Sequence, residues 1–179
     1  MIISKKHLTA VLSAFSFIAL TGCASTVPSA DFKKPIADTY RLCSNDDARV
    51  KFVATEGLTL NGYDLHRLKS RIQQAIDTKK SHIKCKTPDK RVFVLYSKIT
   101  NYDEGNDFAR FMLAGLGQIH IDGDFVLSLL PAGDEKVAEF TIQKTFAWGG
   151  LYGASIGIED IEPAFAEGVA KAIVAQTAE

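Results

Sequence analysis

A stretch of alternating side chains at residues 119–129 constrains the fold more than any other feature. Alternation with a period of two predicts a β-strand whose apolar side chains share one face and whose polar side chains share the other. Gly123 interrupts the apolar row and is compatible with a bulge. A strand of this kind belongs in a sheet with one buried and one solvated face. The apolar set is Ile119, Ile121, Phe125, Leu127 and Leu129, and the polar set is His120, Asp122, Asp124 and Ser128.

A second alternating stretch follows at once. Residues 131–134 have the composition of a turn, and residues 136–146 place Ala138, Phe140 and Ile142 on one side of a further strand. Two alternating strands joined by a short turn predict an antiparallel hairpin.

The part of the chain before this hairpin predicts a strand, a helix and another strand. Residues 48–54 alternate, and residues 91–100 are rich in β-branched and aromatic side chains. Between them, residues 62–79 carry apolar side chains at helical spacing after an N-terminal cap at Asn61. A helical crossover of this length predicts that the two strands run parallel.

Two more helices complete the expected fold. Residues 106–114 predict a short helix, and the final helix is expected from about Pro163 to about Gln176. The sum is an α+β fold with a small mixed four-stranded sheet, in the order β-α-β, short helix, β-hairpin and α, with the helices on one face. We expect this single domain to occupy residues 43–179.

The start of the chain predicts export. Lys5 and Lys6 precede an apolar run at residues 8–20, which is the layout of a secretory signal peptide. A spanning helix needs about 20 apolar residues, so an uncleaved membrane anchor is the less favoured alternative.

The segment Leu20-Thr21-Gly22-Cys23 resembles the bacterial lipobox. The resemblance implies cleavage before Cys23, diacylglycerol on its sulfur and an acyl chain such as palmitate on the new N-terminus. Several acyl chains anchor a protein stably to a bilayer. The resemblance also favours the outer membrane, facing the periplasm, because Ala24 and not Asp follows the cysteine.

The proposed leader and the following segment define two regions ahead of the domain. We expect a signal peptide over residues 1–22, and the lipidated cysteine with a flexible tether over residues 23–42. The tether is inferred from small, polar residues interrupted by Pro28 and Pro35.

The two remaining cysteines, Cys43 and Cys85, predict a disulfide. Each lies seven residues before a strand residue, Val50 and Val92 respectively, so adjacent parallel strands would bring the thiols together. An oxidising periplasm favours closure, and loop entropy would then stabilise the fold by about 4 kcal/mol. Two unpaired cysteines are the alternative, since no Cys-x-x-Cys or nearby histidine spacing indicates a metal or redox site.

A glycine-rich pattern spans residues 105–117. Gly105-Asn106 is followed by Ala109-Arg110 and then by Gly115-Leu116-Gly117. This pattern resembles a family of bacterial envelope lipoproteins of unknown function that share Gly-Asn-x-x-Ala-Arg and Gly-x-Gly before a strand, a hairpin and a terminal helix. The resemblance runs from about residue 43 to the C-terminus and brings no catalytic residues. The chain departs from the family pattern at the hairpin, residues 130–134, which puts the exact turn but not the fold in question.

Two sets of residues are candidates for interaction. Trp148 and Tyr152 lie among three glycines between the last strand and the last helix, where exposed aromatic side chains would contact a protein partner or a bilayer. Alternatively, Trp148 folds back onto the core. His120 and Asp122 share the polar strand face and would be acid–base candidates if that face lined a groove, although a half-solvated sheet explains them without a function.

Charge and motifs narrow the class of function. The chain has 21 basic and 21 acidic side chains and a formal net charge of 0, which provides no basic field for nucleic acid. We find neither zinc-like ligand spacing nor a Gly-x-Ser-x-Gly nucleophile. We therefore predict no catalytic residues, no metal and no cofactor apart from the covalent lipid. The sequence favours a non-enzymatic, membrane-anchored lipoprotein that docks onto another envelope protein; a periplasm-facing small-ligand or glycan binder is the alternative.

Overall fold

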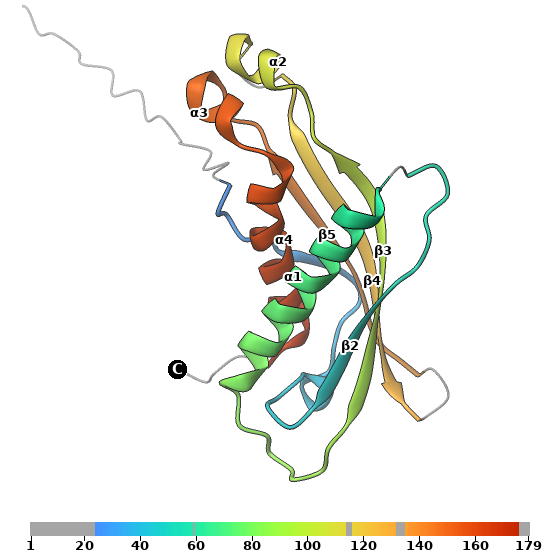
Figure 1. Cartoon of the computed structure of the whole chain (residues 1–179). Helices are drawn as coiled ribbons and strands as arrows, with labels where there is room; N and C mark the ends of the chain where they lie inside the picture. Colours follow the sequence, from blue (N-terminus) through green and yellow to red (C-terminus); the bar gives the residue numbers. More distant parts are fainter. Residues whose placement is uncertain (1–23, 59, 114–115, 132–134, 176–179) are drawn as a thin grey trace, which may run out of the picture.

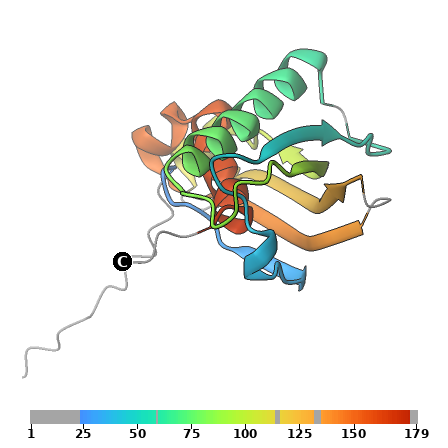
Figure 2. The same cartoon turned by 90° about the horizontal axis from the view of Figure 1, so that it is seen from below.

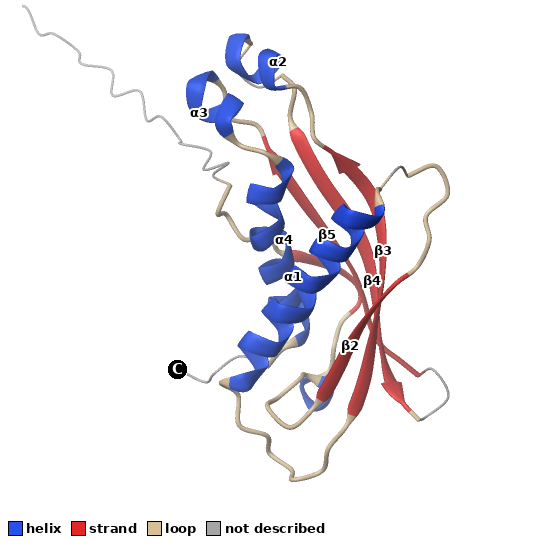
Figure 3. Ribbon diagram, in the orientation of Figure 1, coloured by secondary structure: helices blue, strands red, loops and turns tan. Residues whose placement is uncertain are grey.

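The computed structural model describes residues 24–58, 60–113, 116–131 and 135–175. The strands are β1 (Ala30–Lys34), β2 (Asp47–Phe52), β3 (Val92–Asp103), β4 (Ile119–Leu130) and β5 (Glu135–Phe146). The helices are α1 (Gly62–Ser81), α2 (Asp107–Met112), α3 (Gly150–Ser155) and α4 (Ile158–Ile173), with a 3₁₀ helix η1 (Asp38–Tyr40). The long helices α1 and α4 lie on one face of the sheet, and the short helices α2 and α3 stand at one end (Figure 1, Figure 3).

The sheet is mixed, with the strand order β1-β5-β4-β3-β2. β2 and β3 are parallel, as the helical crossover predicts, and β4 and β5 form the predicted antiparallel hairpin. Seen from below, the sheet lies beside the two long helices (Figure 2). The expected α+β class and the expected helix layer are therefore confirmed.

The expected number of strands is wrong by one. The fifth strand, β1, lies inside the segment that we expected to be a flexible tether. It pairs antiparallel with β5, with Ala30 opposite Ile142 and Phe32 opposite Phe140. The rings of Phe32 and Phe140 lie 5.4 Å apart. The sheet therefore begins before residue 43, because apolar side chains on this short strand extend the core.

Helix α1 begins where its cap predicts. The side-chain oxygen of Asn61 accepts the backbone N–H of Asp64 at 2.9 Å, which satisfies one of the free amides of the first turn. Its buried stripe is Leu68, Ile72 and Ile76.

Helix α4 begins five residues before the expected start, so Pro163 lies inside it. At its N-terminus, Gly157 donates its N–H to the carboxylate of Asp160 at 2.8 Å. Proline has no N–H and cannot bond the carbonyl four residues earlier. Here that carbonyl, of Glu159, accepts a hydrogen bond from Arg71 of α1. The lost helix bond is replaced across the helix pair, so α4 continues through the proline.

One apolar core lies between the sheet and the helices α1 and α4. Phe125 of β4 stacks on Phe140 of β5 with 5.2 Å between ring centroids, and Phe165 of α4 lies 6.0 Å from Phe125. No helix of the described residues is long and apolar enough to cross a membrane.

A side chain of α1 covers the open edge of β2. The side-chain oxygen of Gln73 accepts the N–H of Val50 at 3.0 Å, and its amide nitrogen donates to the carbonyl of Ala48 at 2.8 Å. The amide therefore bonds the edge as a further strand would, which satisfies groups that an edge strand leaves unpaired.

Candidate functional site: an apolar tip built by α2 and α3

Helices α2 and α3 contact each other at one end of the molecule (Figure 1). Exposed apolar side chains lie on these two helices and on the segments beside them. We call this end the tip. Leu151 is 80% exposed and Phe108 is 72% exposed. Single exposed apolar side chains are ordinary, but a contiguous group of them marks an interaction surface. The exposed apolar side chains of the tip are Phe108, Phe111, Met112, Leu113, Leu116, Trp148, Leu151 and Tyr152.

The two aromatic candidates belong to this tip. Trp148 is 41% exposed and Tyr152 is 49% exposed. Their rings meet edge to face at 6.0 Å, and Tyr152 in turn meets the buried ring of Phe146 at 6.0 Å. The pair therefore rests on the end of the core on one side and remains open to solvent on the other.

The glycine-rich pattern builds the turn that carries α2. Gly105 and Gly117 have positive φ values of 67° and 69°. A Cβ at Gly105 would lie 2.2 Å from the carbonyl oxygen of Gln118, and one at Gly117 would lie 2.3 Å from that of Asn106. The side chain of Asn106 caps α2 by accepting the N–H of Ala109 at 2.8 Å. Only glycine tolerates both the backbone conformation and the close approach.

The arginine of the same pattern holds the tip together. Arg110 is only 1% exposed. Its Nε donates to the carbonyl of Gly153 at 2.9 Å and its Nη2 to that of Ile156 at 3.1 Å. Its Nη1 donates to the carbonyls of Gly117 at 2.7 Å and Glu104 at 2.9 Å. One guanidinium therefore joins α2, its flanking turns and α3.

The first described residues are bound to the domain at the same end. Lys144 of β5 donates to the carbonyl of Thr26 at 2.7 Å. Pro28 lies against α4, where a Cβ on Gly168 would lie 2.9 Å from its ring. Ala24 packs partly against the core. The first described residues, from Ala24 onward, therefore lie against the domain.

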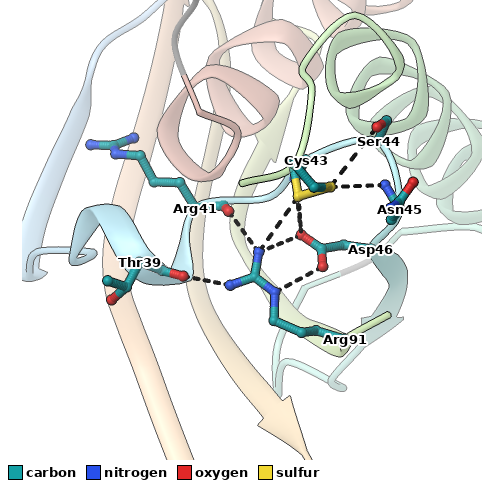
Figure 4. Close-up of a disulfide and its surroundings, with 8 residues drawn as sticks. Thr39, Arg41, Cys43, Ser44, Asn45, Asp46 and Arg91 are labelled. Atoms are coloured by element: carbon teal, nitrogen blue, oxygen red, sulfur yellow. Dashed lines mark hydrogen bonds and ion pairs between the residues drawn. A yellow bond between two sulfur atoms is a disulfide. The ribbon is translucent and has the colours of Figure 1, made fainter. Parts of the chain in front are cut away.

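The structure describes two of the three cysteines. Cys23, the predicted lipidation site, lies outside the described residues. Cys43 and Cys85 form the predicted disulfide, with 5.2 Å between their Cα atoms (Figure 4). The strand register is not the one implied by equal spacing, because Val50 lies opposite Leu95. The loops before the strands therefore bring the cysteines together.

A buried ion pair supports this disulfide (Figure 4). The carboxylate of Asp46 is buried and accepts Arg91 Nε at 2.9 Å and Nη2 at 2.6 Å. It also accepts the N–H of Cys43 at 2.9 Å. Arg91 donates further to the carbonyls of Thr39 and Arg41. Because a buried carboxylate needs such partners, the group ties η1 and the disulfide loop to the start of β3.

His120 and Asp122 lie half-buried on the sheet face turned away from α1 and α4. His120 Nδ1 lies 3.0 Å from the hydroxyl of Thr145, and Asn101 donates to Asp122 at 3.3 Å. Each side chain therefore contacts a neighbouring strand. Two hollows on the described surface lie elsewhere, one on α1 around His66 and one between β1 and α4.

A buried charged cluster was not anticipated from the sequence. Glu162 of α4 is fully buried and accepts Arg67 Nε at 3.0 Å and Nη2 at 3.1 Å. Arg71 lies 2.9 Å from the same carboxylate, and the Tyr102 hydroxyl donates to it at 2.7 Å. Burial, and then the bond to Glu162, raise the pKa of Tyr102. The cluster joins α1, α4 and β3. Its one sequence cue is a glutamate within the apolar stripe of the last helix.

The geometry defines a sheet-and-helix domain whose glycine and arginine pattern builds an apolar tip. Residues 55–150 match the family described as "Domain of unknown function (DUF4410)". This segment is more than half of the chain, and the chain belongs to that family. The predicted resemblance to a family of unknown function is confirmed at this level. The matched range includes α2, Gly105, Arg110 and Gly117.

Solved structures share the fold at low sequence identity. A PelC dodecamer from Paraburkholderia phytofirmans that carries a single substitution has 13% identity and a TM-score of 0.52, covering 84% of this chain and 100% of that one. The PelC dodecamer without that substitution, from the same organism, has 15% identity with the same TM-score and coverage. A chain named as a candidate lipoprotein from Caulobacter crescentus CB15 has 18% identity over 68% of this chain and 82% of that one, but its TM-score of 0.35 supports no argument. The sequence has no match among curated proteins.

Proposed function

We propose that this chain is a lipid-anchored lipoprotein of the bacterial envelope that has no enzymatic activity and docks onto another envelope protein. The lipid is carried by Cys23 and is the only non-protein group in the proposal. The proposed location is the outer membrane, facing the periplasm.

The course of residues 24–34 carries the anchoring part of the proposal. The segment is bound to the domain through β1 and through the contact of Lys144 with Thr26. A lipid on the residue before Ala24 would hold the domain directly at a bilayer, with no need for a spanning helix. The disulfide between Cys43 and Cys85 is typical of an exported protein.

The proposed docking surface is the outer face of the sheet, which no helix of the described chain covers (Figure 3). Tyr96 and Val126 lie opposite each other on this face and are both half-buried. Lys51 lies 6.0 Å from the Tyr96 ring, and Thr141 donates to Asp124 at 2.7 Å. An apolar centre surrounded by polar groups is the usual composition of a protein–protein interface.

The likeness to PelC adds a class of partner. The PelC structures are dodecamers. By analogy with these assemblies, we include further copies of the chain among the proposed partners.

Membrane fractionation tests the anchor. The wild-type chain should remain in the outer-membrane fraction after a carbonate wash, and Cys23→Ser should not. The matched control is Cys43→Ser with Cys85→Ser, which removes two cysteines and should leave the protein in the membrane. A Cys23→Ser chain that matures normally and stays in the membrane fraction after the wash would overturn the proposed anchor.

Photo-crosslinking in intact cells tests the docking surface. A crosslinking amino acid in place of Tyr96 should yield a discrete adduct, whereas one in place of the exposed Lys69 on α1 should not. An adduct with twice the mass of the chain would identify a second copy as the partner. Equal labelling at both positions, or none at Tyr96, would contradict docking through this face.

A further inference from the structure

We propose that the tip is a membrane-contacting surface that inserts its apolar side chains between lipid headgroups and acyl chains beside Cys23. The inference rests on the lipid anchor of the proposed function and specifies what lies against the tip, namely lipid.

The composition of the tip favours a lipid interface. Eight of the eleven exposed large apolar side chains found among the described residues belong to it. Trp148 and Tyr152 combine an apolar ring with a polar atom, and such side chains are enriched at the boundary between membrane and water. Within the described residues of the tip, Arg110 is the one basic side chain, and its guanidinium is buried. The expected contact is therefore apolar and not an attraction to anionic headgroups.

The position of the anchor brings the tip to the bilayer. Lys144 fixes Thr26 at the end of β5, and Phe146, two residues further along that strand, contacts Tyr152 of the tip. Two residues separate Thr26 from Cys23. Three steps of extended chain span at most about 11 Å. A lipid on Cys23 would therefore enter the bilayer next to the tip.

The tip also has a defined structure without any contact to a membrane. Arg110 binds carbonyl groups on both sides of the α2–α3 contact, so the apolar side chains are presented by an ordered structure. A short link to the lipid leaves little space for a protein between this end and the membrane. These two features favour lipid over a protein partner at the tip.

Trp148 is the single tryptophan of the chain and reports directly on the proposed contact. The full chain, matured and acylated in bacteria, is purified and reconstituted into phosphatidylcholine vesicles. In half of the vesicle preparations, one acyl chain of the phosphatidylcholine carries bromine at a position close to the headgroup. An inserted interfacial surface reaches about 5–10 Å below the headgroups, so bromine should reduce Trp148 fluorescence by about twofold.

Two variants serve as controls. Trp148→Phe with Tyr96→Trp moves the single tryptophan to the outer face of the sheet, where bromine should have no effect. Phe108→Ser with Leu151→Ser removes the two most exposed apolar side chains of the tip and should weaken the quenching of Trp148. Because both side chains are exposed, this variant should keep the circular dichroism spectrum and unfolding midpoint of the wild type.

The outcomes separate the two proposals. Flotation with vesicles and quenching of Trp148 support the inference. Flotation without quenching overturns the inference and leaves the anchor standing, and so does equal quenching of the relocated tryptophan. Failure of the acylated chain to float with vesicles overturns the lipid anchor itself.

Discussion

At the scale of single residues, Arg110 is the side chain on which the tip depends most. It supplies donors to four carbonyl groups from a buried position. Buried carbonyls left without a partner cost about 1–3 kcal/mol each when water does not replace the lost donor. Arg110→Met should therefore lower the free energy of unfolding by about 3 kcal/mol and loosen α2 and α3.

Urea unfolding and amide hydrogen exchange would measure these effects. The matched control is Arg49→Met, since the side chain of Arg49 is 64% exposed. If the amide hydrogens of α2 and α3 exchanged at the same rate in Arg110→Met as in wild type, Arg110 would not be the side chain that stabilises the tip.

A second residue-scale prediction concerns pH. Burial and the bond to Glu162 raise the pKa of Tyr102 in the folded state. In the unfolded chain the hydroxyl ionises at about pH 10. Above that pH the unfolded state binds fewer protons than the folded state, so this contribution to stability is present below pH 10 and falls as the pH rises further.

Unfolding by urea across the range from about pH 9 to about pH 11 would test this sign. Wild type should lose stability more steeply than Tyr102→Phe, while Tyr63→Phe, which changes an exposed tyrosine, should follow wild type. Parallel curves for wild type and Tyr102→Phe would contradict the assignment.

At the scale of elements, Gln73 connects α1 to the edge of β2. Its amide forms two hydrogen bonds with the strand backbone. Gln73→Leu leaves both backbone groups without this partner and should lower the free energy of unfolding by about 1–2 kcal/mol. Gln74→Leu is the neighbouring control, because Gln74 is exposed. Equal stability of the two variants in urea would refute a role for Gln73 at the edge.

The elements that the sequence predicted are those with strong local patterns. β4 and β5 alternate over their length, and α1 has both a cap and an apolar stripe. β1 was missed because only Ala30 and Phe32 mark its inner face between prolines and lysines. The start of α4 was placed too late because Pro163 is tolerated through a bond between Arg71 and Glu159 that local sequence does not contain.

The candidate site was predictable in part. The glycine and arginine pattern and the aromatic pair Trp148 and Tyr152 indicated the right region. The apolar side chains of α2 and the helix α3 were not recognised as part of it. Their exposure depends on the way Arg110 joins two segments that are distant in sequence, and no local periodicity reports such a contact.

At the scale of the whole molecule, the path from the first described residues to the domain depends on a close contact. A Cβ at Gly168 of α4 would lie 2.9 Å from the ring and the carbonyl oxygen of Pro28. Gly168→Ala should therefore push residues 24–29 off the helix and increase their hydrogen exchange and proteolysis.

Gly62→Ala is the matched control, because a Cβ there meets nothing within 4 Å. It should leave the N-terminal segment as protected as in wild type. Equal protection in the two variants would show that the contact between Pro28 and Gly168 does not hold the segment in place.

The direction of α4 has a practical consequence for labelling. The helix runs for 16 residues, or about 24 Å, away from α3 (Figure 1), and the residue that follows it, Val174, bridges to Leu42. A fluorophore or capture handle joined after this helix should therefore lie away from the tip and leave its aromatic side chains unobstructed. Attachment at the carboxyl side is thus the choice for imaging or pull-down experiments that test contacts of the tip.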